Sequence, residues 1–166
     1  MDTVTLHVNI ERPREEVFAY LADVANHPEF TDHFLTDWRL TREDSEGRGA
    51  GARYRQTGRF DRFGYYDLSL ADVEFPFRIT AFGRGGKYNR IKTFHQWTLE
   101  PNGPAGTRLE YVYDSEPALP TDKLIEALGG RRGWFRRNAG KGLRRLRSIL
   151  EENRDRGARA TIGGLD

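Results

Sequence analysis

Six extended segments follow one another through the middle of the chain, and short turn-forming stretches separate them. The segments span residues 36–43, 52–60, 65–74, 78–83, 89–100 and 107–116. Between them lie sequences such as GRGAG at 47–51 and PNGPAG at 101–106, whose Gly, Pro and Asn residues suit tight turns. Consecutive strands with short connections usually pair as neighbours, so this feature predicts an antiparallel meander.

The segment before the meander predicts one more strand and two short helices. Residues 4–10 alternate apolar and polar side chains, which is typical of a strand with one buried face. From Arg14 the apolar residues recur at helical spacing for about three turns. The Asn26-His27-Pro28 sequence then predicts a break, and residues 29–34 predict a second short helix.

The segment after the meander predicts a long helix. Thr121 is a candidate N-cap for a helical region that reaches about Asn153, with interruptions expected at Gly129, Gly130 and Gly133. One side of this helix is apolar: Phe135, Ala139, Gly142, Leu143, Leu146, Ile149 and Leu150. The opposite side is basic: Arg136, Arg137, Lys141, Arg144, Arg145 and Arg147. Residues 154–166 are polar and rich in Gly, which predicts a disordered tail.

Composition excludes several classes of protein. With 166 residues the chain suits a single domain, which we expect over residues 1–153. It contains no cysteine, so disulfides, thiolate nucleophiles and cysteine-bound zinc are excluded. Neither a secretory leader nor a transmembrane segment is recognisable, and we expect a cytoplasmic protein.

The order of elements, together with several local sequences, resembles the START-like or SRPBCC superfamily, and within it the polyketide cyclase/dehydrase and lipid-transport group. The sequences that carry the resemblance are VTLHVNIERPREEVFAYLADVANHPEF, GARYRQ, DVEFPFRI, GTRLEYVYD and GLRRLRSILEE, within residues 4–153. The resemblance implies an α+β helix-grip fold, in which a seven-stranded curved antiparallel sheet wraps around the long C-terminal helix, with two short helices between strands 1 and 2. It also implies an apolar cavity between sheet and helix for a hydrophobic small-molecule ligand.

The more apolar face of each strand predicts which residues line that cavity. On the strands these ligand-binding candidates are Tyr54, Gln56, Tyr66, Leu68, Leu70, Trp97 and Leu109. On the helix they are Phe135, Asn138 and Gly142. His95, Tyr111 and Tyr113 fall on the same faces and are the candidate catalytic residues.

Histidine exchanges a proton near neutral pH, and a tyrosine hydroxyl can donate to a developing enolate. Aldol cyclisation or dehydration of a poly-β-ketone needs these two groups, so an aromatase-type cyclase or dehydratase is one hypothesis for His95. The alternative is that His95 is a hydrogen-bonded residue of the cavity wall. The sequence leaves open whether the protein is an enzyme.

Other kinds of site find less support. His27 and His33 match no metal-binding spacing and are expected on the surface or in a loop, so no metal and no cofactor are predicted. The glycine-rich loop at 47–51 lacks the Lys-Ser/Thr ending of a phosphate-binding loop. No Ser-His-Asp arrangement is supported by the spacing.

The basic side of the last helix has several interpretations. Residues 131–166 hold 11 of the 27 basic residues and only 4 of the 25 acidic ones. A solvated face, an acidic partner, nucleic acid and an anionic membrane are all compatible with this charge. Because Phe135 points inward rather than offering a stacking surface, no nucleic-acid partner is expected. Arg131 and Arg132 are predicted either to meet an anionic group of a guest or to lie exposed at a helix break.

Three functional hypotheses follow. The first is a carrier that binds an aromatic, polyketide-like or lipid-like molecule in the cavity. The second is a polyketide cyclase or dehydratase that uses His95 and tyrosines as acid-base groups. The third is an interaction module that docks an acidic partner on the basic helix face. A homodimer is compatible with all three.

Overall fold

One antiparallel sheet of seven strands dominates the computed structural model, which describes residues 3–58, 64–121, 123–124 and 130–166. The strands are β1 (Val4–Ile10), β2 (Leu35–Leu40), β3 (Gly51–Gln56), β4 (Tyr65–Glu74), β5 (Arg78–Gly85), β6 (Ile91–Asn102) and β7 (Gly106–Pro117). Their order is β1-β7-β6-β5-β4-β3-β2, so the N-terminal strand is added to the meander at one edge.

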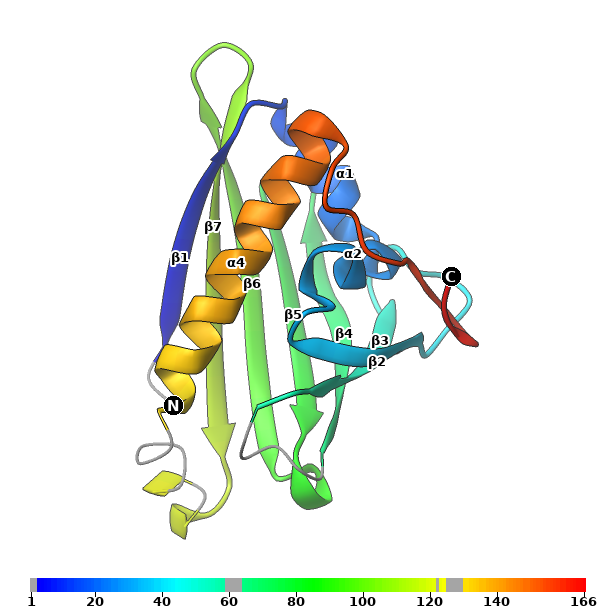
Figure 1. The fold of residues 1–166 in the computed structure, drawn as a ribbon, viewed down its shortest axis with the longest axis vertical. Coiled ribbons are helices and arrows are strands. Elements are labelled where there is room, and N and C mark those ends of the chain that lie inside the picture. Colours follow the sequence, from blue (N-terminus) through cyan, green and yellow to red (C-terminus); the bar gives the residue numbers. More distant parts are fainter. Residues whose placement is uncertain (1–2, 59–63, 122, 125–129) are drawn as a thin grey trace.

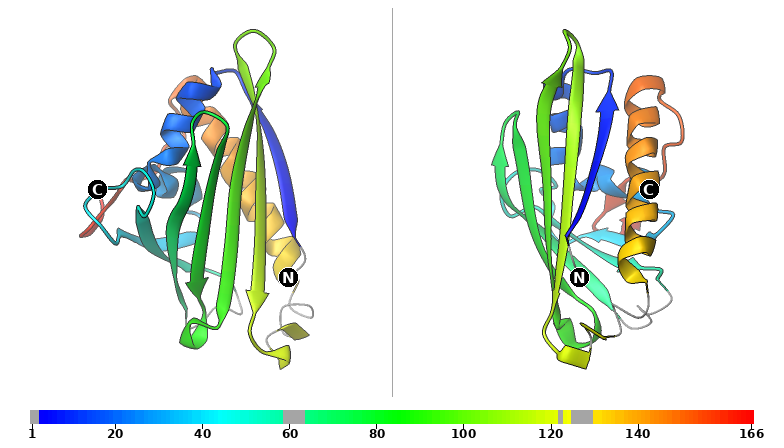
Figure 2. Two further views of the ribbon diagram at one scale, coloured as in Figure 1. Left: turned by 180° about the vertical axis from the view of Figure 1, so that it is seen from behind. Right: turned by 90° about the vertical axis from the view of Figure 1, so that its left-hand side faces the viewer.

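The long helix lies across the concave face of this sheet (Figures 1 and 2). The helices are α1 (Arg14–Ala22), the 3-10 turn η1 (Val24–Asn26), α2 (His27–Thr31), the 3-10 turn η2 (Lys87–Asn89) and α4 (Arg131–Glu152). A curved seven-stranded sheet around a C-terminal helix, with short helices between β1 and β2, confirms the predicted α+β helix-grip fold.

Alternation along the strands decides which side chains face the helix. In β6 the residues Ile91, Thr93, His95, Trp97 and Leu99 are buried, while the residues between them are exposed or half-buried. In β7 the same alternation buries Leu109, Tyr111 and Tyr113. The two strands pair directly, with His95 opposite Tyr113 and Trp97 opposite Tyr111.

A bulge in β2 changes this alternation. The register between β2 and β3 shifts between Thr36 and Arg39, and Asp37 has a positive φ of 55°. The extra residue reverses the facing of the strand, so that Leu35 and Trp38, three positions apart, are both buried. A strictly alternating strand would have put one of them on the outside.

The second helix begins earlier than predicted. α2 spans His27–Thr31, with Pro28 in its first turn, whereas the sequence predicted a break at residues 26–28 and a helix over 29–34. Proline is well tolerated in the first turn because the N–H that it lacks has no partner within the helix there. Pro28 therefore belongs to the first turn of α2 instead of breaking the chain between two helices.

The C-terminal helix is amphipathic, as predicted, and packs its apolar side on the sheet. Phe135, Leu143 and Leu146 are buried there. Gly130 adopts the left-handed conformation just before the helix, while Gly133 lies inside it and does not interrupt it. Pro120 and Thr121 are already helical, so Thr121 is not an N-cap, and the predicted interruption at Gly129 lies outside the described residues.

The segment after α4 is ordered, which corrects the prediction of a disordered tail over residues 154–166. It runs past α2 (red in Figure 1) and ends in a hairpin of β8 (Ala160–Thr161) and β9 (Gly164–Leu165). The amide of Gly157 donates to the carbonyl of Glu29 at 2.8 Å, and the Arg159 guanidinium pairs with the Asp23 carboxylate. Residues of this polar tail therefore form contacts with α2 and with the start of η1.

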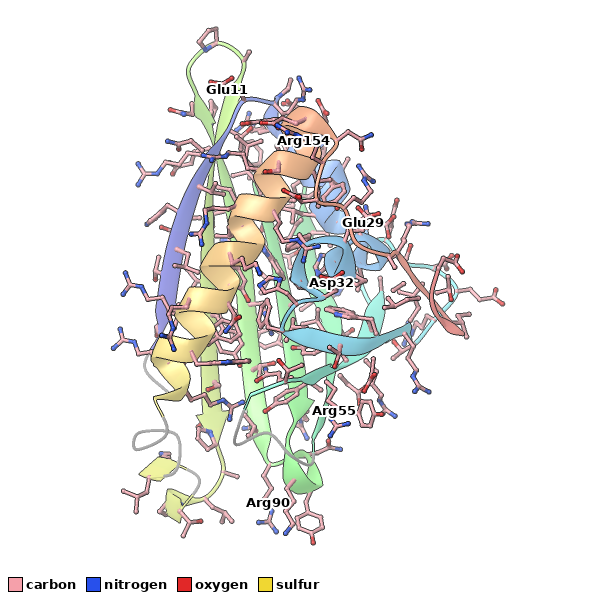
Figure 3. The ribbon with its side chains drawn as sticks, viewed as in Figure 1. Glu11, Glu29, Asp32, Arg55, Arg90 and Arg154 are labelled. Atoms are coloured by element: carbon pink, nitrogen blue, oxygen red, sulfur yellow. The ribbon has the colours of Figure 1, made fainter. Side chains whose placement is uncertain are left out.

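One basic residue of α4 also differs from expectation. Arg145 was predicted on the outer basic face, but its side chain turns toward α2 and the tail. It pairs with the Asp32 carboxylate and donates to the carbonyls of Glu29 and Asp155, each at 3.0 Å. Figure 3 shows Glu29 and Asp32 where α2, α4 and the tail come together. None of the helices in the described part of the chain is long and apolar enough to cross a membrane.

Candidate functional site

A cavity lies between the sheet, α4 and the segment from α2 to β2. The sheet contributes Tyr54, Leu68, His95, Trp97 and Tyr111, and α4 contributes Phe135, Ala139, Gly142 and Leu143. The remaining wall is built by His27, Phe30, Thr31, Phe34, Leu35 and Trp38. None of these residues is Asp, Glu, Lys or Arg, and the polar groups among them are confined to His, Thr and Tyr side chains and the Trp indoles.

The cavity is narrow. The centre of a water molecule can move in about 40 Å³ of it. One water occupies roughly 10–15 Å³ on this measure, so the space holds a few water molecules. Typical small-molecule sites enclose about 300–1,000 Å³. An organic guest therefore needs the walls of this cavity to move apart.

Seven of the thirteen predicted site residues lie in the cavity wall. They are Tyr54, Leu68, His95, Trp97, Tyr111, Phe135 and Gly142. Gly142 is also a point of close approach between α4 and α2, because a Cβ atom there would lie 3.2 Å from the carbonyl oxygen of Phe30. The cavity wall at this point is thus partly backbone.

The other six predicted residues lie outside the wall for identifiable reasons. Tyr113 is covered by Phe135, whose ring stacks on it with centroids 3.8 Å apart. Leu70 and Leu109 are on the concave face but are enclosed by the core. Asn138 is half-buried and donates its side-chain amide to the carbonyl of Trp134 at 2.8 Å.

Gln56 and Tyr66 belong to a separate polar cluster around Arg131. The Arg131 side chain is buried, and its guanidinium donates to Gln56 Oε1 at 3.2 Å and to the Tyr66 hydroxyl at 2.6 Å. The alternative that Arg131 lies exposed at a helix break is therefore wrong. Arg132 is exposed and reaches the carbonyl of Thr3 at 3.5 Å.

His95 is fully engaged within the wall. Its Nδ1 lies 2.9 Å from the Tyr111 hydroxyl, and its Nε2 lies 3.3 Å from Thr93 Oγ1. Burial, with a smaller effect from nearby His27, lowers the pKa of His95 to about 3. The ring is therefore neutral at physiological pH, and a base this weak takes up a proton only with difficulty.

The two tyrosines of the wall carry neutral hydroxyl groups. Burial is the main reason that the pKa of Tyr54 and of Tyr111 is raised well above its usual value, because it disfavours the phenolate. Both hydroxyls therefore keep their protons at neutral pH. The Tyr111 hydroxyl can donate to His95 Nδ1, which leaves the proton of that neutral histidine on Nε2, toward Thr93.

His27 is a wall residue that the sequence did not reveal. It was expected on the surface or in a loop, yet it is 3% exposed. Its Nε2 lies 2.8 Å from the carbonyl of Leu21, and burial is the main cause that lowers its pKa. The available signal was Pro28, since a proline in the first turn of a helix would have placed His27 at the start of α2.

Aromatic rings surround the hollow on several sides. Trp97 stacks on Tyr111 with centroids 5.2 Å apart, and the ring centroid of Trp38 lies 4.7 Å from that of Tyr54. Trp38 was missed because only the bulge at Asp37 turns it inward. In the part of the chain that the structure describes, no group of three or more His, Asp or Glu side chains is placed to hold a metal ion.

Solved structures confirm the architecture. A protein from Thermus thermophilus superposes with a TM-score of 0.70 at 17% identity, over 92% of this chain and 99% of that one. A START superfamily protein from Mycobacterium smegmatis gives 0.65 at 16% identity, over 91% and 98%. Norcoclaurine synthase from Thalictrum flavum gives 0.62 at 12% identity, over 91% and 87%. At these identities the likeness shows the fold alone.

No curated protein matches this chain in sequence. A family model described as polyketide cyclase / dehydrase and lipid transport, however, matches residues 1–151. The match spans the sheet, the cavity wall and nearly all of α4, and it stops before the ordered tail. This chain therefore belongs to the polyketide cyclase/dehydrase and lipid-transport family.

Proposed function

We propose that this protein binds a neutral, ring-containing apolar molecule between the sheet and α4. The observation that carries the proposal is the wall itself: among its described residues aromatic rings predominate, and none is Asp, Glu, Lys or Arg. A charged guest would lose its hydration there without gaining a counter-charge. An uncharged aromatic or polyketide-like guest loses little hydration free energy and gains ring contacts with Trp38, Trp97 and Tyr54.

In this proposal the structure corresponds to the closed state of the binder. Because about 40 Å³ is free, a guest enters only when wall side chains are displaced. Phe135 and Phe34 contact each other edge-on, with centroids 5.9 Å apart, and connect α4 to the segment after α2. Rotation of these two rings, or a shift of α2, enlarges the hollow while the sheet keeps its pairing. Binding that requires such a change is slower than rigid docking.

A filled-cavity variant tests this proposal. Ala139 lies in the wall on α4, so Ala139→Leu places three additional carbon atoms in the hollow. We expect 2-naphthol to bind the unmodified protein in a calorimetric titration and to bind Ala139→Leu at least about tenfold more weakly. Arg144→Leu, on the exposed side of the same helix, is the matched control and keeps the original affinity. Equal affinity for all three proteins places the guest outside this cavity.

The cyclase or dehydratase hypothesis has one observation in its favour. The Tyr111 hydroxyl and His95 Nδ1 lie 2.9 Å apart at the cavity wall, which is the geometry of an acid-base pair. The low pKa of His95 makes it a weak base, so we rank binding above catalysis. Turnover of a poly-β-ketone surrogate that is lost in Tyr111→Phe, with binding retained, reverses this order.

The third hypothesis rests on the outer face of α4. Arg136, Arg137, Lys141, Arg144 and Arg147 lie on this face, and no described residue forms an ion pair with any of them. Arg145 does not belong to this face, because it is bonded to α2 and the tail. If this face docks an acidic partner, the protein should bind polyglutamate. The binding should weaken steeply with salt and disappear when Arg136, Arg137 and Arg144 are changed to Gln. Binding of the polymer that survives these three changes excludes this face.

A further inference from the structure

Two buried histidines lie near Trp97 in the cavity wall. The centroid of the His27 ring is 5.3 Å from that of Trp97, and the centroid of His95 is 5.9 Å from it. His27 comes from α2 and His95 from β6. Although both rings border the hollow, their hydrogen bonds leave them with different capacities for a guest.

His95 has no nitrogen to spare. One ring nitrogen faces the Tyr111 hydroxyl at 2.9 Å, and the other faces Thr93 Oγ1 at 3.3 Å. All of these partners belong to β6 and β7. A guest could bond His95 only by displacing a partner that the sheet already supplies.

His27 is different because the only described hydrogen-bond partner of its ring fixes its tautomer. Its Nε2 lies 2.8 Å from the carbonyl oxygen of Leu21 at the end of α1. A carbonyl oxygen only accepts, so Nε2 carries the proton and Nδ1 of the neutral ring carries the lone pair. No described residue hydrogen-bonds to Nδ1. The lone pair is thus an acceptor on a buried wall residue that no other described side chain uses.

We propose that His27 Nδ1 accepts a hydrogen bond from a hydroxyl group of the guest, and that the guests of this protein are neutral aromatic alcohols such as phenols and naphthols. This inference rests on the proposed binding function and names the class of guest for the same cavity. It assigns the recognition role to His27, which belongs to the helical segment, and leaves His95 as a part of the wall.

The surroundings of His27 support a flat aromatic guest with a donor at its edge. Its ring contacts Phe30 and Trp38, with centroids 5.7 and 6.4 Å away, in addition to Trp97. These rings offer faces and edges for stacking a planar molecule. A guest hydroxyl that donates to Nδ1 satisfies an acceptor for which no described residue supplies a donor. Loss of the hydroxyl from the guest should therefore weaken its binding markedly.

A matched pair of compounds tests the inference. 2-Naphthol carries the hydroxyl donor, and 2-methoxynaphthalene has the same rings without it. In calorimetric titrations of the unmodified protein we expect 2-naphthol to bind about tenfold more tightly, which corresponds to about 1.4 kcal/mol. In His27→Phe, which keeps a ring but has no acceptor, the ratio should fall to about two, with the affinity for 2-methoxynaphthalene unchanged within about threefold.

Two further variants separate recognition from folding. His27→Leu also removes the acceptor, with a side chain of different shape, and it should lose most of the preference even if His27→Phe is unstable. His33→Gln removes a neighbouring imidazole that bonds the carbonyl of Asn138 at 3.0 Å and lies outside the cavity wall. It should retain the preference of the unmodified protein.

The outcomes are distinguishable. A preference for 2-naphthol that persists in both His27 variants, or equal affinity of the two compounds for the unmodified protein, overturns the role of His27 while the cavity remains a binding site. Failure of both compounds to bind the unmodified protein overturns the proposed binding function, and the inference about His27 with it.

Discussion

The ring of Phe135 stacks on the ring of Tyr113 with centroids 3.8 Å apart and an interplanar angle of 19°. This contact connects α4 to β7 and places Phe135 at the boundary between the packed core and the hollow. The side chain is buried, and it fills space that a guest could otherwise use.

Truncation of this ring should therefore enlarge the cavity. We expect Phe135→Ala to lower the free energy of unfolding by about 3–5 kcal/mol. Apolar cavities of roughly 150 Å³ bind benzene, so benzene should raise the melting temperature of the variant more than that of the unmodified protein. Phe82→Ala, on the exposed face of β5, should show no additional response to benzene. Equal responses of all three proteins contradict the placement of Phe135 beside the hollow.

The pKa of His95 predicts a dependence of stability on pH. Burial lowers this pKa to about 3, below the ordinary value of 6.5. As the pH falls below about 6.5, the unfolded chain gains a proton at this residue and the folded chain does not, so stability is lost progressively down to about pH 3. From pH 7 to pH 5 the expected loss from this residue is about 2 kcal/mol.

Urea unfolding at pH 7 and pH 5 measures this contribution. Since Gln cannot be protonated, the difference in unfolding free energy between the two pH values should be smaller in His95→Gln by about 2 kcal/mol. All other titrating groups are present in both proteins and cancel. The same pH dependence in both proteins is the contrary result.

Adjacent arginines on α4 should respond very differently to truncation. Arg145 pairs with Asp32 and donates to the carbonyls of Glu29 and Asp155, whereas Arg144 is exposed and has no described ion-pair partner. We expect Arg145→Ala to destabilise the protein by about 2–3 kcal/mol, because it removes the cation paired with Asp32 and the guanidinium donors to the two carbonyls. Arg144→Ala should stay within about 0.5 kcal/mol of the unmodified protein. The midpoints of denaturant unfolding measure the stability of both variants. Equal destabilisation by the two substitutions would contradict this expectation.

The tail should contribute to stability through its ion pair with Asp23, at the start of η1. The Asp23 side chain is 8% exposed, and the Arg159 guanidinium is its cation. We expect Arg159→Met to cost about 2–3 kcal/mol in thermal or urea unfolding, because the buried carboxylate loses this partner. Arg154→Met removes the exposed pair with Glu152 and should change stability by less than about 0.5 kcal/mol. If the tail is dispensable for the fold, the two variants should have the same stability.

The strands were predictable because each carries a local signal. The run over residues 65–74 coincides with β4, and the faces assigned to His95, Trp97 and Tyr111 are the buried ones. Alternation and turn residues depend only on neighbours in the sequence, so one chain suffices to recognise them. The amphipathic C-terminal helix was recognisable for the same reason.

The wall opposite the sheet was not predictable in this way. Trp38 faces inward only because a bulge at Asp37 breaks the alternation, and His27 is buried where Pro28 begins a helix. The position of the free space also depends on how all elements pack together. Leu70 and Leu109 are on the predicted face, but neighbouring side chains enclose them and leave them outside the cavity.

The structure of the tail over residues 154–166 was also not predictable from the sequence. Its composition resembles that of disordered segments, because it is polar and rich in Arg and Gly. Its order depends on buried carboxylates at Asp23 and Glu29, far earlier in the chain, with which Arg159 and Arg156 pair. Such pairing leaves no periodic signal in the sequence of the tail itself.

The position of bound 2-naphthol tests the proposed binding site most directly. Isotope-filtered nuclear Overhauser spectra of the labelled protein with unlabelled 2-naphthol report which side chains touch the guest. If the guest lies in the cavity, we expect contacts to the indole protons of Trp38 and Trp97 and to the methyl group of Ala139, which line the hollow from three different elements. Contacts confined to the outer face of α4, or to the outer face of the sheet at Phe82 and Phe94, would contradict it.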